Sequence, residues 1–168
     1  MRRLIPVLLI AAAAGLAPPA GAGAGCTITG TNGDDRLIGT AGDDVLCGRG
    51  GDDFIKGKGG DDRARGGGGE DVIILGPGSD RGNGQGDDDI VDGNGGGDRL
   101  SGGRGQDFLR GFGGPDVLLG GRNRDCLYAV DGVGGNDRAV GGPGTDFHDV
   151  DPGDQLESAE QAGSCAGD

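Results

Sequence analysis

The feature of this 168-residue chain that most restricts its fold is a nine-residue period with aspartate in phase. From Gly30 the sequence divides without a gap into blocks of nine that begin GTNGDDRLI, GTAGDDVLC and GRGGDDFIK. Eleven blocks cover residues 30–128, and two more cover residues 132–149 after three extra residues at 129–131. Such a period predicts a repeat fold, in which each repeat buries its apolar face against its neighbours.

Four block positions carry the pattern. Position one is glycine in 12 of 13 blocks, with Leu75 as the exception, and position four is glycine in 11, with Asp87 and Asn123 departing. Position eight is usually aliphatic, and Gly82 is one of its weak members. Position six is always aspartate: Asp35, Asp44, Asp53, Asp62, Asp71, Asp80, Asp89, Asp98, Asp107, Asp116, Asp125, Asp137 and Asp146. A disordered linker has no reason to keep aspartate in phase over 13 repeats, so disorder is expected only without metal.

Composition and spacing together predict an all-β fold. Glycine supplies 44 residues and aromatic residues only 3%, so an ordinary helical domain is disfavoured because each interior glycine costs about 1 kcal/mol. Positions one to six predict a turn, and positions seven to nine predict a very short strand with position eight facing inward. Two blocks then close one coil of 18 residues, and successive coils stack as parallel strands with the turns in two columns.

The charge and the turn residues point to a metal. The net charge is −13, and the acids comprise 25 Asp against 3 Glu, so cations are the expected partners, while nucleic acid and stable membrane insertion are not expected. Turn carbonyls and carboxylates offer only hard oxygen ligands, which suit Ca²⁺. Zn²⁺ is disfavoured because His148 is the single histidine, and Mg²⁺ because it retains its waters.

The blocks resemble the nonapeptide Gly-Gly-x-Gly-x-Asp-x-U-x of the RTX (repeats-in-toxin, hemolysin-type) calcium-binding proteins, in a small secreted form. The resemblance covers residues 30–149. It implies a parallel β-roll, a right-handed β-solenoid with two nonapeptides per coil, with Ca²⁺ between stacked turns and the 13 position-six aspartates as metal ligands. The sequence departs from the pattern at position two (Thr31, Thr40, Arg49, Lys58) and carries a second acid at position five in early blocks (Asp34, Asp43, Asp52, Asp61).

Thirteen turns on two edges leave at most about 11 gaps for Ca²⁺, and gaps next to Leu75, Gly82, Asp87 or Asn123 are expected to be weaker. We expect folding to be coupled to Ca²⁺ binding, since stacked aspartates repel one another without a cation. Loss of the two arginines of the leader would leave a charge of −15, which seven to eight divalent ions would neutralise.

Three segments are predicted: a signal peptide at 1–24, with cleavage after Ala24, the roll at 25–149 and a C-terminal cap at 150–168. Residues 153–157 are predicted to form one last strand. An uncleaved anchor and a lipidated Cys26 are the alternatives for the leader. Export favours disulfides, and of the three possible pairings the register favours Cys26–Cys47, with Cys126–Cys165 by elimination.

The function predicted is that of a secreted, extracellular calcium-binding protein, not an enzyme. The alternative is a Ca²⁺-dependent adhesive module that binds a cell surface or a glycan, and a fragment that accompanies an enzyme is a further reading. No HExxH or GxSxG motif occurs, and His148, beside Asp146 and Asp149, occupies a position-eight slot. An ice-binding ladder would need a longer run than Thr31 and Thr40.

Overall fold

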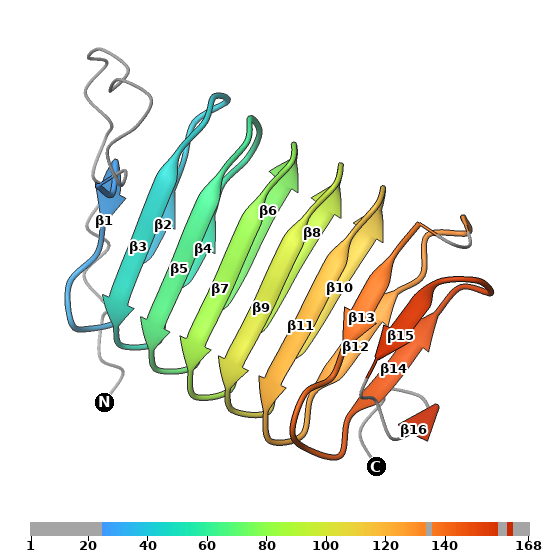
Figure 1. The fold of residues 1–168 in the computed structure, drawn as a ribbon. Helices are drawn as coiled ribbons and strands as arrows, with labels where there is room; N and C mark the ends of the chain where they lie inside the picture. The colour runs from blue at the N-terminus through green and yellow to red at the C-terminus, as the bar shows by residue number, and fades with distance from the viewer. Residues whose placement is uncertain (1–24, 134–135, 158–160, 163–168) are drawn as a thin grey trace, which may run out of the picture.

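The computed structural model describes residues 25–133, 136–157 and 161–162. Within these residues the regular secondary structure consists of β-strands alone. The predicted signal peptide at 1–24 lies outside the described residues. The strands form two eight-stranded sheets in which all neighbours are parallel, and successive strands alternate between the two sheets (Figure 1). The predicted parallel β-roll is therefore confirmed.

The first sheet contains β1 (Ile28–Thr29), β3 (Val45–Gly50), β5 (Arg63–Gly68), β7 (Arg81–Gly86), β9 (Arg99–Arg104), β11 (Val117–Arg122), β13 (Arg138–Val140) and β15 (Gln155–Glu157). The second contains β2 (Arg36–Ile38), β4 (Phe54–Lys56), β6 (Val72–Pro77), β8 (Ile90–Gly95), β10 (Phe108–Gly113), β12 (Cys126–Ala129), β14 (Phe147–Val150) and β16 (Gln161–Ala162). In the view of Figure 1 the first sheet lies in front.

Strand pairing follows the length of the coil. Leu46 pairs with Ala64, which lies 18 residues later, and this offset holds through the first eleven blocks. For strand pairs that span the insertion the offset is 21, as in the pair Leu118 and Ala139. Because β12 continues through the buried Ala129, the turn after β12 accommodates the extra length.

Most strands in the middle of the roll are longer than the three residues that the sequence predicts. They run for six residues, from position seven of one block to position three of the next, as β5 does. The glycine-rich positions are included because the equivalent segment of the next coil lies alongside them; Gly67, for example, pairs with Gln85. Hydrogen bonding between coils therefore extends the strand where side-chain patterning gives no signal.

The core lies between the two sheets and consists mainly of position-eight side chains, as predicted. The large members that are fully buried are Leu46, Ile55, Ile73, Val91, Leu100, Leu109, Leu118 and Leu127. Each contributes about 1.5–3 kcal/mol on burial. The stack therefore builds a continuous core from one aliphatic residue per repeat.

In one block the core residue comes from position one instead of position eight. Block 75–83 has Gly82 at position eight, and its only large aliphatic residue is Leu75 at position one, which is fully buried. A Cβ added to Gly82 would lie 3.2 Å from Cδ1 of Leu75 and 2.6 Å from Cγ1 of Val91. The Leu75 side chain therefore occupies the core space that Gly82 leaves.

The ends of the roll are closed differently. A disulfide joins Cys26 to Cys47 between the first two strands of the front sheet, which confirms that predicted pair. The other predicted pair involves Cys165, which lies outside the described residues. At the C-terminal end the predicted last strand is present as β15, which pairs with β13. The described residues contain no helix that could cross a membrane.

Candidate metal sites

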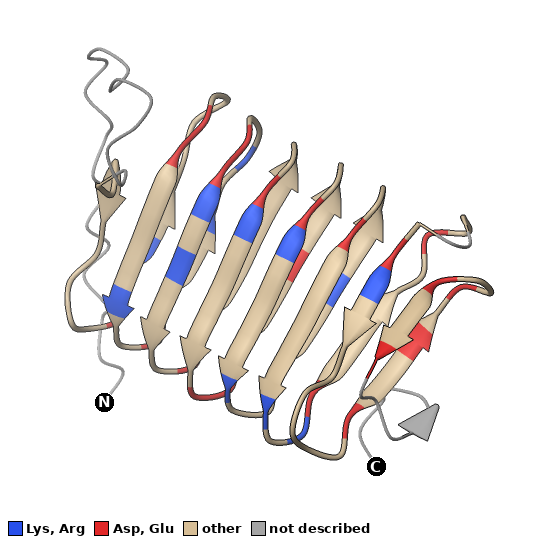
Figure 2. Ribbon diagram, viewed as in Figure 1, with Lys and Arg blue, Asp and Glu red and all other residues tan. Residues whose placement is uncertain are grey.

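The position-six aspartates lie in the turns, each directly before a strand. All 13 are buried except Asp35, which is partly exposed, and most are at most 2% exposed. Figure 2 shows these acids as red segments where the strands begin. The fold thus places two columns of carboxylates inside the edges of the roll, where an uncompensated charge is costly.

In eleven of the 13 carboxylates, those from Asp53 onward, one oxygen joins neighbouring coils. The backbone N–H of Asp53 donates to Oδ1 of Asp71 at 2.9 Å, and the same bond recurs in eleven pairs at 2.6–3.0 Å. The ladder continues across the insertion, where the N–H of Asp116 donates to Asp137. The carboxylates are therefore fixed by backbone donors in a regular array.

The second oxygen is left without a partner through most of the array. Oδ2 is buried and accepts no hydrogen bond in Asp53, Asp62, Asp71, Asp80, Asp89, Asp98, Asp107, Asp116, Asp125 and Asp137. Native proteins rarely leave a buried polar atom unsatisfied. Ten such oxygens recur at the same position of the repeats, and bound cations would satisfy them where the polypeptide itself offers no donor.

The first two blocks satisfy this oxygen differently. Thr31 donates to Oδ2 of Asp35 from its backbone N–H at 2.5 Å and from its hydroxyl at 2.8 Å. Thr40 makes the same contacts to Asp44 at 2.6 and 2.9 Å. The threonines that depart from the glycine pattern at position two thus hold the first carboxylates of both columns.

Glycine recurs at positions one and four of the blocks for two different reasons. A Cβ added at position one of block 57–65, at Gly57, would lie 2.6 Å from the carbonyl oxygen of Leu75 and would overlap Oδ2 of Asp62. In most blocks position four instead has a left-handed backbone, as at Gly51 with φ of 91°. Asp87 and Asn123 occupy position four with φ of 70° and 82°, a conformation that Asp and Asn tolerate better than other side chains.

The acids at position five also place carboxylates at these turns, and the sequence pattern did not predict them as metal ligands. Oδ1 of Asp52 accepts from the N–H of Glu70 in the following coil at 2.9 Å, whereas Asp71 accepts from the preceding coil. The two carboxylates therefore face one inter-turn gap from opposite sides. Five gaps have such a pair: Asp34/Asp53, Asp43/Asp62, Asp52/Asp71, Asp61/Asp80 and Asp88/Asp107.

Burial changes the protonation of these columns. Loss of hydration raises the pKa of Asp53, Asp62, Asp71, Asp80 and Asp107 to about 6, and of Asp116 and Asp125 to about 7. The pKa of Asp89 rises to about 8, mainly through burial and further through the charges of Asp107, Asp71 and Asp87. Repulsion between neighbouring carboxylates thus adds to burial, and a bound cation would relieve both.

The turns after β10 and β11 lack the second acid. Position five is Pro115 in one and Arg124 in the other, and the Arg124 guanidinium lies 4.5 Å from the centre of the Phe147 ring. In the insertion, backbone N–H groups of Gly114 and Val133 hold the Asp131 carboxylate and lower its pKa. Both turns thus lack an acid at position five, although Asp131 contributes a carboxylate at the turn after β10.

No three side chains of Asp, Glu, His or Cys converge on one point in the described part of the chain. An ion between turns would therefore be held by one or two carboxylates together with backbone carbonyls. Flexible oxygen coordination of this kind suits Ca²⁺ and excludes a thiolate or imidazole site. The fold and this array define a class: a parallel β-solenoid with cation sites between its stacked turns.

Comparison with protein families agrees with this class. The family model of the RTX calcium-binding nonapeptide repeat matches residues 27–55, 48–82, 56–91, 92–127 and 130–147. The chain belongs to this family, as its sequence pattern predicts, and is a calcium-binding repeat protein. No curated protein matches the chain in a sequence search.

Proposed function

We propose that this protein is exported and that its roll folds on binding several Ca²⁺ ions between adjacent turns. The observation that carries the proposal is the row of ten buried Oδ2 atoms without a hydrogen-bond partner. The ligands we propose are the 13 position-six aspartates, with position-five carboxylates in the five paired gaps. Bound Ca²⁺ would neutralise these acids, and the ladder of Oδ1 bonds would hold them in place.

The proposed sites fall into two kinds, with at most about 11 in total. Gaps that contain two carboxylates, such as Asp52/Asp71, carry enough charge to neutralise one divalent ion. Gaps with one carboxylate, such as that of Asp98, depend more on carbonyl oxygens. We expect the paired gaps to bind more tightly, because the affinity of oxygen sites for Ca²⁺ rises with ligand charge.

Export and the absence of catalysis are parts of the same proposal. The basic, apolar leader at residues 1–24 and the Cys26–Cys47 disulfide support export, since disulfides persist in oxidising compartments. The family repeats occupy residues 27–147 almost without interruption, which supports a non-catalytic role.

Calorimetric Ca²⁺ titration and far-UV circular dichroism test the proposal on the chain from residue 25 onward. We expect several ions to bind, with a gain of β-structure that a chelator reverses. Asp71→Asn should lower the stoichiometry by at least one ion. Asp149→Asn removes an exposed acid on β14 and should leave it unchanged. A β signal that is identical with and without chelator would contradict coupled folding, and equal stoichiometry in both variants would contradict the ligand assignment.

A further inference from the structure

A shallow groove lies on the outer face of the front sheet, away from the turns. Side chains at positions seven and nine of β5, β7 and β9 line it: Arg63, Arg65, Arg81, Asn83, Arg99 and Ser101. Ala64 and Gly82, the small residues between them, complete the lining of this space of about 200 Å³. We call this feature the arginine groove. Figure 2 shows its basic residues as blue segments on three neighbouring strands.

The three position-seven arginines of the groove lie in register, and no acidic partner is found for them in the described part of the chain. Arg63 pairs with Arg81 and Arg81 with Arg99 across the sheet, and among the described residues none of the three forms a salt bridge. Like charges directly opposite one another destabilise a sheet. On the other sheet, by contrast, Arg110 has an acidic partner, Asp92, at 2.5 Å.

The fold does not require arginine in this column. Val45 and Val117 occupy the equivalent position on the flanking strands β3 and β11. The chain as a whole carries a net charge of −13, yet this surface gathers four exposed cations. An external anion would offset the repulsion within the column and would explain why the acids are absent here.

The shape and chemistry of the groove indicate the kind of anion. Strands lie about 4.8 Å apart, so the groove extends over about 10 Å from β5 to β9, roughly the length of a disaccharide. Guanidinium groups bind carboxylates and sulfates through two parallel hydrogen bonds, and Asn83 and Ser101 can bond to sugar hydroxyls. The lining has no aromatic side chain on which a nucleotide base could stack.

We propose that the arginine groove binds a segment of a linear acidic polysaccharide, with the anionic groups on Arg63, Arg81 and Arg99 and the hydroxyls on Asn83 and Ser101. The polymer lies along the stacking axis, across the strands, because the three arginines repeat in that direction. The site is separate from the inter-turn gaps, but it exists only in the folded roll.

Binding is measured with excess Ca²⁺ on the chain from residue 25 onward, using dextran sulfate, hyaluronan, uncharged dextran and oligo(dT) as probes. We expect binding to dextran sulfate, hyaluronan or both, and the difference between these two distinguishes sulfate from carboxylate recognition. Dextran should not bind. Equal binding of dextran, or tighter binding of oligo(dT) than of both acidic polysaccharides, would overturn the proposal.

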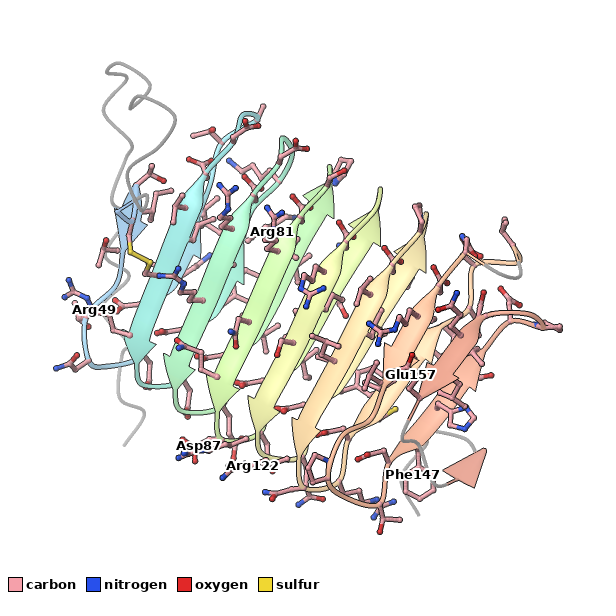
Figure 3. All side chains as sticks on the ribbon, in the orientation of Figure 1. Arg49, Arg81, Asp87, Arg122, Phe147 and Glu157 are labelled. Atoms are coloured by element: carbon pink, nitrogen blue, oxygen red, sulfur yellow. A yellow bond between two sulfur atoms is a disulfide. The ribbon has the colours of Figure 1, made fainter. Side chains whose placement is uncertain are left out.

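A matched pair of variants locates the site. Arg81→Gln with Arg99→Gln should weaken binding about tenfold, as expected for two exposed ion pairs. Arg104→Gln with Arg122→Gln removes two arginines that are also opposite one another, but at the ends of β9 and β11, where the turns begin (Figure 3 labels Arg122). This change should alter affinity less than about twofold. Equal loss in both variants would overturn the proposal. Unchanged circular dichroism and Ca²⁺ stoichiometry in both would show that a failed groove leaves the calcium function intact.

Discussion

Leu75 gives the sharpest test of how this roll builds its core. The repeat pattern alone suggests that Leu75→Gly restores a missing position-one glycine and improves the protein. The structure predicts the opposite, because the leucine is fully buried and fills the space beside Gly82. Removing a buried leucine side chain costs about 2–5 kcal/mol, and glycine in a strand adds about 0.5–1 kcal/mol.

We therefore expect Leu75→Gly to lower the free energy of unfolding by about 4 kcal/mol, which lowers Tm by roughly 10 °C in a domain of this size. Gly82→Leu alone should also destabilise, by about 1–3 kcal/mol, because its Cβ would lie only 2.6 Å from Val91. The two changes together return block 75–83 to the repeat pattern. In the double variant the new leucine fills the cavity, so the loss should be clearly smaller than the sum of the two single losses.

The assay is a double-mutant cycle by thermal or denaturant unfolding in excess Ca²⁺. A coupling energy of about 3 kcal/mol is expected, the upper end of what residues in contact show. Gly82→Leu combined with Leu118→Gly is the matched control, and its energies should add because β7 and β11 are not adjacent. A neutral or stabilising Leu75→Gly, or an additive cycle, would refute this account of the core.

Three further perturbations have outcomes that the structure fixes. Replacing Cys26 and Cys47 with serine opens a cross-link over 21 residues and should cost about 3 kcal/mol, measured by unfolding in Ca²⁺; no loss would mean that the disulfide adds nothing to the first coil. Lys58→Gly should stabilise by about 1 kcal/mol, since Lys58 has φ of 95°, whereas Lys56→Gly in β4 should destabilise. In chelator, the folded roll should gain stability as pH falls from 8 to 5: burial raises the pKa of the aspartates to about 6–8, so the folded state binds more protons than the unfolded state, and this stability is lost as pH rises through that range. A β signal that increases with pH in chelator would contradict the last prediction.

Much of this architecture could be predicted from the period of nine. Aspartate in phase and one aliphatic residue per block define the coil of 18 residues, because only that stacking puts each carboxylate beside the next and each leucine in one core. The same register places the segment that follows Cys26 beside the strand that contains Cys47, with Thr29 opposite Cys47, and so brings the two cysteines within reach of each other. These features depend on spacing alone, and spacing is what a sequence shows directly.

Other features depend on direction, which spacing does not reveal. Asp52 accepts a hydrogen bond from the following coil and Asp71 accepts one from the preceding coil. The two carboxylates lie in one gap only because they point in opposite directions. The arginine groove was equally hidden, since position seven carries Arg81 on one sheet and Phe108 on the other. Separating odd from even blocks in the sequence would have found it.

The unequal distribution of acids bears on how the roll closes. Four of the five paired gaps lie between Asp34 and Asp80, so most of the position-five carboxylates that a cation would neutralise belong to the N-terminal coils. The Cys26–Cys47 disulfide lies at this same end and holds the first two strands of the front sheet together regardless of metal. The cross-link therefore reduces the entropic cost of closing the coils that depend most on Ca²⁺. The C-terminal turns have Pro115 and Arg124 at position five and so lack the second carboxylate of those coils.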